Sequence, residues 1–259
     1  MHRFHIPPER LASEVFLTGR EWYHASKVLR LRRGDELTVL DGAGRALLCR
    51  IAEEAKEKFL LEVRSVKEFP RGPEIILFQA LPKGKIIESI IQEATELGVA
   101  RIVPLLTERV SSDPDDDRAA KKIEKWQAVA IEAMKQCGTA WLPQVEALVT
   151  PEKAIQNCAK RDLSFVASLE SDSLPARQFF DSYQAPQGNA PQTVSVWIGP
   201  EGDFTPAEYK IIRLAGAQPI TLGSLVLRVE TAAICALSII NYELRCRAAK
   251  TSPNSSSIT

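Results

Sequence analysis

Three segments in the second half of the sequence place glycine, proline and charged residues directly after apolar runs that are typical of buried strands. The central segment is Gly199-Pro200-Glu201-Gly202, which follows the run 194–198; the others lie at 168–170 and 222–232. Glycine lets the main chain approach a flat ligand and expose N–H and C=O groups to it, and proline stiffens the turn. Because ligands bind outside the carboxyl ends of strands in open α/β sheets, these segments are candidate binding loops.

The third segment contains one charged residue inside an apolar run. Arg228 stands next to Leu227 and Val229, and a buried arginine needs an anion. Two interpretations carry equal weight at this point. Glu201 or Glu230 pairs with Arg228 in a structural contact, or Arg228 binds a substrate phosphate or an enolate-like oxygen.

Several other kinds of site are excluded or disfavoured. The glycines fit neither a Walker phosphate loop nor the G-x-G-x-x-G dinucleotide fingerprint, which disfavours a Rossmann nucleotide enzyme. The five cysteines form no C-x-x-C pair, and all three histidines lie within residues 2–24, so we expect no disulfide and no metal site. The GPEG sequence by itself is equally compatible with a structural turn.

Strands and helices alternate in the second part of the chain. Fully apolar strands alternating with helices predict a mostly parallel α/β sheet that is covered on both faces. Thr205 and Pro206 are suited to the N-cap and first position of one helix. The predicted strands are 75–81, 99–106, 164–169, 194–198 and 218–222. The predicted helices are 83–97, a long helix from 115 or 116 to 136, 206–215 and 230–245.

The first part of the chain has a different pattern. Short predicted strands at 36–40, 46–51 and 59–63, with one helix at 20–30, indicate a small β-barrel. Two prolines and a glycine at 67–73 interrupt regular structure. We therefore place a domain boundary there.

The net charge is zero, with 33 Lys and Arg against 33 Asp and Glu, but basic residues gather locally around Arg30, Arg32 and Arg33. Such a cluster is either a polyanion-binding patch or a solvated helix end. Lys83 and Arg109 follow predicted strands of the second part and join the candidate phosphate contacts. No apolar run approaches the length of a bilayer span and no apolar leader is present, so we expect a cytoplasmic protein without membrane contact.

Six motifs, taken in order, give the sequence a specific resemblance. It resembles the SPOUT class of RNA methyltransferases and, within that class, the RsmE family, which methylates N3 of a uridine in 16S ribosomal RNA. The motifs are VLRLRRGDEL at 28–37, QALPKGK at 79–85, IIQEATELGV at 90–99, LLTERV at 105–110, WIGPEGDF at 197–204 and LGSLVLRVETA at 222–232.

The resemblance implies a PUA-like RNA-binding β-barrel in residues 1–70 and a SPOUT domain with a deep trefoil knot in 74–247; the Ser-rich tail 248–259 is expected to be disordered. It also implies S-adenosyl-L-methionine as cofactor, a homodimer, and 16S ribosomal RNA of the small subunit as substrate. The cofactor-binding residues carried over are Leu169, Ile198, Gly199, Pro200, Glu201, Gly202, Leu222, Gly223, Leu227, Thr231 and Ala232.

Arg228 is the expected catalytic residue, and Arg30, Arg32, Arg33, Lys83 and Arg109 are the expected RNA contacts. The chain departs from the family pattern in two places: Asp203 stands where a second glycine is usual, and Ser224 or Leu225 where arginine or asparagine is common. Two alternatives stay open, a non-catalytic RNA-binding or ribosome assembly factor and a SPOUT methyltransferase that acts on another RNA.

Overall fold

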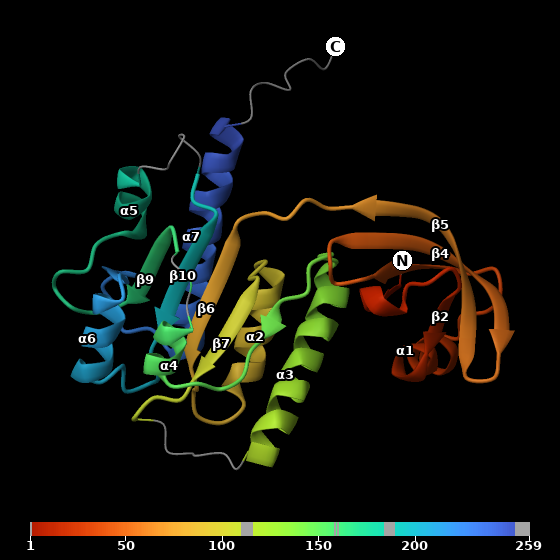
Figure 1. Cartoon of the computed structure of the whole chain (residues 1–259), viewed down its shortest axis with the longest axis horizontal. Helices are drawn as coiled ribbons and strands as arrows, with labels where there is room; N and C mark the ends of the chain where they lie inside the picture. The colour runs from red at the N-terminus through yellow and green to blue at the C-terminus, as the bar shows by residue number, and fades with distance from the viewer. Residues whose placement is uncertain (1, 110–115, 158, 160, 184–189, 252–259) are drawn as a thin grey trace. The chain divides into compact units, whose positions relative to one another are not determined.

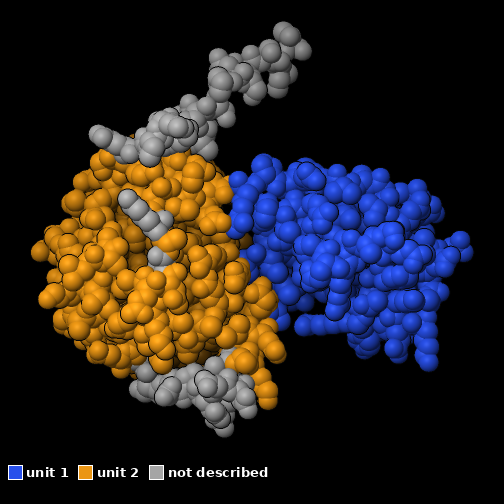
Figure 2. Space-filling model, in the orientation of Figure 1, with its two compact units in different colours: residues 1–71, 128–143 blue, residues 72–127, 144–259 orange. Residues whose placement is uncertain are grey.

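The computed structural model describes residues 2–109, 116–157, 159, 161–183 and 190–251. The chain forms two compact units (Figure 2). The first consists of Met1–Arg71 and Ala128–Pro143, and the second of Gly72–Gln127 and Gln144–Thr259.

The second unit is built on a six-stranded sheet in which every described pairing is parallel. The sheet order is β11-β9-β10-β6-β7-β8. The predicted parallel sheet is therefore confirmed. Its strands are β6 (Glu74–Ala80), β7 (Arg101–Leu105), β8 (Gln144–Val145), β9 (Leu163–Ala167), β10 (Thr193–Ile198) and β11 (Gln218–Ile220).

Helices cover both faces of this sheet (Figure 1). Successive strand residues point to opposite faces. Val166 packs into one core with residues of α4 (Pro151–Gln156) and α6 (Pro206–Leu214). Its neighbour Phe165 contacts Phe180 of α5 (Ala176–Ser182) on the other face, where α7 (Val229–Thr251) packs on β6, β10 and α2 (Ile86–Glu96).

The first unit contains a five-stranded sheet of order β1-β3-β4-β5-β2 around one apolar core. Two bulges in the β4–β5 ladder, at Leu48/Cys49 and Ile51/Glu53, bend these long strands, since a bulge increases local twist. The strands are β1 (Arg3–His5), β2 (Val15–Thr18), β3 (Glu36–Leu40), β4 (Arg45–Ala55) and β5 (Lys58–Glu68).

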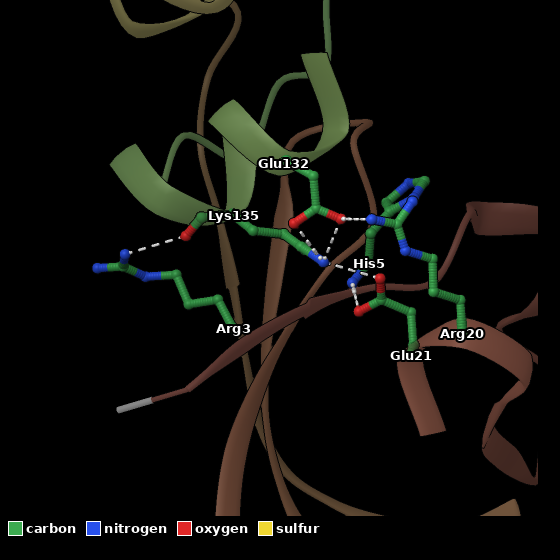
Figure 3. Close-up of polar contacts among 6 residues, drawn as sticks. All are labelled: Arg3, His5, Arg20, Glu21, Glu132 and Lys135. Carbon is green, nitrogen blue, oxygen red and sulfur yellow. Dashed lines mark hydrogen bonds and ion pairs between the residues drawn. The ribbon is translucent and has the colours of Figure 1, made fainter. Parts of the chain in front are cut away.

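The end of helix α3 (Asp116–Cys137) and the residues after it belong to this first unit. The Lys135 ammonium is buried and donates to Glu21 Oε1 at 2.8 Å and to Glu132 Oε1 at 3.0 Å, while Arg3 Nη1 donates to the Lys135 carbonyl at 3.2 Å (Figure 3). Further on, Gly44 N donates to the Ala140 carbonyl. The contacts of Lys135 with Glu21 and of Arg3 with Lys135 link segments more than a hundred residues apart in sequence.

Two predicted elements differ from the structure. The helix predicted at 20–30 is a short α-helix, α1 (Gly19–Tyr23), followed by a π-helical turn, η2 (His24–Val28). The chain then reverses through Arg30 at φ 59°, which lets the buried Leu31 donate its N–H to the Ala25 carbonyl. Helix α7 continues to Thr251, past residue 248 where we expected the tail to start, and residues 252–259 lie outside the described residues.

The domain limits 1–70 and 74–247 remain predictions, although the division between Arg71 and Gly72 lies close to the first limit. The structure adds residues 128–143 to the first unit, which a boundary based on one proline-rich break does not include. Within the described part of the chain, no helix combines the length and apolar character needed to cross a bilayer.

Candidate cofactor pocket and active site

Three neighbouring strands of the second unit end at the same edge of the sheet. Strands β11, β9 and β10 are adjacent and parallel, so the loops that follow them start side by side. These are the three segments that the sequence singles out. The positions of β9, β10 and β11 thus explain how residues about 60 positions apart reach one site.

The loops enclose a cavity of about 520 Å³. Its lining is mostly apolar, with one arginine, three carboxylates and a serine hydroxyl, and this volume lies in the usual range for a small-molecule site. It contains no histidine or cysteine among the described residues. The lining residues are Ile86, Ala167, Ser168, Leu169, Ile198, Gly199, Pro200, Glu201, Asp203, Leu222, Gly223, Leu225, Val226, Leu227, Arg228, Val229, Glu230 and Ala232.

The structure brings together most of the expected site residues. Leu169, Ile198, Gly199, Pro200, Glu201, Leu222, Gly223, Leu227, Arg228 and Ala232 all line this cavity. Gly202 and Thr231 do not. Gly202 faces Arg109 instead, and Thr231 lies exposed in the first turn of α7.

The central loop is held by residues from two other strand ends. Glu201 Oε1 accepts a hydrogen bond from the Lys83 main-chain N–H at 2.9 Å. The Arg109 guanidinium donates to the carbonyls of Gly202 and Asp203. The order β10-β6-β7 places the loops after β6 and β7 beside the loop after β10, so both contacts follow from the sheet topology.

Asp203, the departure from the family pattern, has φ 63°, a left-handed conformation. Glycine adopts this conformation freely, and aspartate is one of the few other residues that tolerates it. Asp203 N donates to the Pro200 carbonyl at 2.8 Å, and Asp203 Oδ1 accepts from Phe204 N at 2.7 Å. The aspartate therefore replaces glycine without opening the turn.

The loop end is also fixed on the side of helix α6. Thr205 caps the helix, with its hydroxyl accepting from Glu208 N at 3.3 Å, and Glu208 Oε2 accepts from Thr205 N at 2.8 Å. The predicted N-cap is confirmed. Glu208 Oε1 also accepts from Glu108 N at 2.9 Å, which satisfies this buried carboxylate and joins the loop to the end of β7.

Arg228 is exposed and lines the cavity. We expected a buried arginine with Glu201 or Glu230 as the structural alternative, but neither carboxylate pairs with it. Among the described residues the Arg228 side chain has no hydrogen-bond or ion-pair partner. The loop that carries Arg228 runs along the surface, so water solvates the guanidinium and no internal anion is required.

The cavity suits a nucleotide-like cofactor such as S-adenosylmethionine. A Cβ placed on Gly223 would meet nothing within 4 Å, so the main chain there faces open space that a planar ring can occupy. Within the described residues, the N–H and C=O groups of 224–227 make no hydrogen bond to the protein, and they are available to the polar edge of an adenine. The apolar lining can pack against its faces.

Ser168 lies in the candidate segment 168–170 but was not among the expected cofactor-binding residues, and it adds a polar group to the cavity. Its Oγ accepts from the Tyr209 hydroxyl at 2.8 Å and from Glu170 N at 3.1 Å. Burial raises the pKa of Tyr209, which keeps this hydroxyl protonated as the donor. Ile86 was also missed, because it comes from the start of α2 and no local motif links it to the three loops.

The candidate RNA contacts belong to different units. In the first unit Arg30, Arg32 and Arg33 are exposed, and Arg32 pairs with Glu54 at 3.7 Å. In the second unit Lys83 is exposed, while Arg109 is held by loop carbonyls. Within the described residues, no three or more His, Cys, Asp or Glu side chains gather as a metal site requires.

Comparison with known proteins identifies matching families and relatives. The family model for an RNA methyltransferase domain matches residues 68–241, and the model for an RNA methyltransferase PUA domain matches 17–64. The ribosomal RNA small subunit methyltransferase E of Synechocystis is 36% identical over 248 residues, which cover 93% of this chain and 77% of that protein. The protein of the same name from Bacillus subtilis is 31% identical over 231 residues, covering 88% and 89%.

A solved structure agrees with these matches. The ribosomal RNA small subunit methyltransferase E from Neisseria gonorrhoeae, bound to S-adenosyl methionine, superposes with a TM-score of 0.81 at 27% identity and covers 93% of this chain and 97% of that chain. The matched methyltransferase model includes the residues of all three strand-end loops. The chain belongs to the ribosomal RNA small subunit methyltransferase E (RsmE) family of RNA methyltransferases.

Proposed function

We propose that this protein methylates N3 of a specific uridine in 16S ribosomal RNA of the small subunit, with S-adenosyl-L-methionine as methyl donor. The observation that carries the proposal is the single cavity formed by three strand-end loops, with an unpaired arginine at its rim. The relatives described above are named ribosomal RNA small subunit methyltransferase E, and the structure of one of them contains bound S-adenosyl methionine.

The cofactor, when bound, supplies a methyl group on a sulfonium centre. The chain has to align it with the target base, and alignment supplies much of the acceleration in such displacements. Gly199, Gly223 and the main chain of 224–227 would hold the cofactor. Leu169, Leu222 and Leu227 would pack against it and exclude water.

Uracil N3 carries a proton and becomes a good nucleophile only when that proton passes to an acceptor, for which solvent water would serve. The methyl group would then move from the sulfonium to N3, and S-adenosylhomocysteine would leave. Arg228 would stabilise the uracil anion through O2 or O4 of the base, because a fixed positive group is most effective where charge develops. Its lack of an internal carboxylate partner supports this role, since a paired guanidinium would present less charge to the substrate. Glu201 Oε1 accepts from Lys83 N, which supports a positioning role for this carboxylate.

The RNA contacts remain part of the proposal. Arg30, Arg32 and Arg33 would bind phosphates from the PUA-like unit, and Lys83 from the methyltransferase unit. Arg109 would act mainly by holding the cofactor loop. Each phosphate contact should steepen the salt dependence of RNA binding.

We further expect the trefoil knot and the homodimer that the family resemblance implies. Leu169, Leu225 and Val226 are 62%, 74% and 81% exposed beside the cavity, and exposed apolar groups of this kind support a partner surface. Light scattering on the full chain tests the dimer. A monomer at micromolar concentration would contradict it.

The test of the function uses small ribosomal subunits from a strain that lacks this methyltransferase. The purified chain and S-adenosylmethionine should produce 3-methyluridine in 16S ribosomal RNA, as measured by nucleoside mass spectrometry. Arg228→Ala should lower the transfer rate at least about tenfold, or ~1.4 kcal/mol of barrier, with cofactor affinity retained in calorimetry. Near wild-type turnover would refute the role of Arg228, and absence of cofactor binding by the wild-type chain would favour a non-catalytic protein.

A further inference from the structure

A second cavity of about 440 Å³ adjoins the first at Glu201 and is lined by residues of the β6–α2 loop and of helix α3. Leu81, Ile87 and the buried Trp126 form its apolar part. Five of its lining residues are cationic: Lys83, Lys85, Arg109, Lys122 and Lys125. Among the residues that the structure describes, Glu88 and Glu201 are the carboxylates of the lining.

The two carboxylates are engaged elsewhere. Glu88 pairs with Lys125 at 2.6 Å, and Glu201 Oε1 accepts from a main-chain N–H. Arg109 is likewise engaged by loop carbonyls. Neither acid therefore neutralises the other lysines of the cavity.

Three lysines remain without a partner. Among the described residues, no hydrogen bond or ion pair involves the side chains of Lys83, Lys85 or Lys122, and all three residues are exposed. Like charges that line one concave surface raise its potential and attract anions. The N-terminus of α2 at Ile86 adds positive potential at the same place.

The position of the cavity indicates which anion it would take. Glu201 lines both cavities, so a group bound in the second lies next to the proposed methyl-transfer site. The adjoining main chain at Gly84 has φ 72°, and a Cβ there would meet nothing within 4 Å, which leaves the entrance open. A nucleotide whose base reaches the first cavity carries phosphodiester groups on both sides, and these are anions that lysines bind as point charges.

We propose that the cavity between the β6–α2 loop and α3 is a phosphodiester-binding subsite, in which Lys83, Lys85 and Lys122 hold the RNA backbone beside the target nucleotide. This inference rests on the proposed RNA substrate. It adds Lys85 and Lys122 to the RNA contacts and assigns them one shared ligand group.

The experiment compares the triple variant Lys83→Gln, Lys85→Gln, Lys122→Gln with a matched control in the full chain. The control, Lys121→Gln, Lys153→Gln, Lys210→Gln, removes the same charge from exposed lysines outside the cavity. Binding of a fluorescein-labelled oligouridylate is measured by anisotropy across a potassium chloride series. Losing three single-strand phosphate contacts should lower the slope of log K against log salt by about 2, while the control keeps the wild-type slope.

Further measurements separate the possible outcomes. Calorimetry with S-adenosylmethionine should give the same affinity for all three proteins, and the KM for small ribosomal subunits should rise only in the cavity variant. Equal salt slopes in the two variants would overturn the inference. Inorganic phosphate that binds the wild type but not the cavity variant, with unchanged oligouridylate slopes, would assign the cavity to free phosphate and also overturn it. If the wild-type protein transfers no methyl group, but its salt slope still differs from that of the cavity variant, the proposed function is refuted and the phosphodiester subsite is not.

Discussion

Replacing Gly199 by alanine should weaken cofactor binding while leaving the fold in place. A Cβ at this position would lie 2.8 Å from Asp203 Oδ1, 3.2 Å from Phe204 N and 3.3 Å from Asp203 Cα. The last two are main-chain atoms next to the buried Phe204 ring, so they have little freedom to move. Overpacking of this kind costs about 1–3 kcal/mol.

The loop can relieve this strain in the free protein by shifting away from the geometry that lines the cavity. Binding must then restore that geometry, and the strain appears as lost affinity. At 1.4 kcal/mol per factor of ten, the dissociation constant for S-adenosylmethionine should rise about 5- to 150-fold. Isothermal titration calorimetry measures this directly, and circular dichroism checks that the helices and sheet persist.

Three further variants isolate the steric cause. Gly72→Ala should behave as wild type, because a Cβ there would meet nothing within 4 Å. Gly202→Ala should lose less affinity, since its nearest neighbour is Cδ of the flexible Arg109 side chain at 3.3 Å. Adding Asp203→Gly to Gly199→Ala removes the shortest contact and should restore part of the affinity. A Gly199→Ala protein that binds within about twofold of wild type, well under 1 kcal/mol, would refute the reasoning.

Three other predictions concern stability. Asp203→Ala should lower the free energy of unfolding in urea by about 1 kcal/mol, because alanine tolerates the left-handed conformation poorly. Asp203→Asn should stay close to wild type, and equal losses in the two variants would contradict this account. Lys135→Met should lower the free energy of unfolding by about 2–3 kcal/mol, because it leaves the Glu21 carboxylate, 18% exposed, without its cation. Adding Glu21→Leu should recover most of this loss, and no recovery would exclude the ion pair as the cause. Burial lowers the pKa of His5 below its ordinary 6.5, so the unfolded chain binds more protons than the folded one. The free energy of unfolding should therefore fall as the pH decreases through 6.5. If a His5→Gln variant shows the same dependence of this free energy on pH between 7.5 and about 5.5, groups other than His5 cause the fall.

Elements with a strong local pattern could be predicted from the sequence. The apolar runs of β6 and β10 and the capped start of α6 at Thr205 appear where the pattern placed them. Strands β1 (Arg3–His5) and β2 (Val15–Thr18) were missed, because three or four residues are too short to show an alternation.

Long-range contacts explain most of the remaining differences. The predicted strands 46–51 and 59–63 contain the buried residues of β4 and β5, and the structure extends both strands through exposed residues into one antiparallel ladder with ten paired positions. The sequence of helix α3 has the pattern of one amphipathic helix, and this local pattern does not indicate that the last residues of the helix join the first unit. That assignment depends on Lys135 meeting Glu21, 114 residues away in sequence.

The residues of the candidate site likewise divide into those that the sequence could identify and those whose position depends on tertiary packing. Gly199, Pro200 and Gly223 could be selected from residue type and position after a strand, because the parallel sheet brings those strand ends together. Ile86 and Lys122 enter the two cavities from helices whose placement depends on tertiary packing. That Arg228 has no partner among the described residues could not be predicted from the sequence either, since it depends on how far the loop 222–228 lies from the carboxylates around it.

The contacts of Glu201 separate its positioning role from its charge. Its Oε1 atom accepts from the main-chain N–H of Lys83, and a neutral amide oxygen can accept the same hydrogen bond. The geometry of the central loop therefore depends on a hydrogen-bond acceptor at position 201 and on Arg109, which binds the neighbouring carbonyls. The negative charge of Glu201 faces the two cavities that this residue lines. A carboxylate there repels phosphate as well as an ionised base, so we assign Glu201 to holding the loop. The lysines of the second cavity must outweigh its charge for RNA to bind.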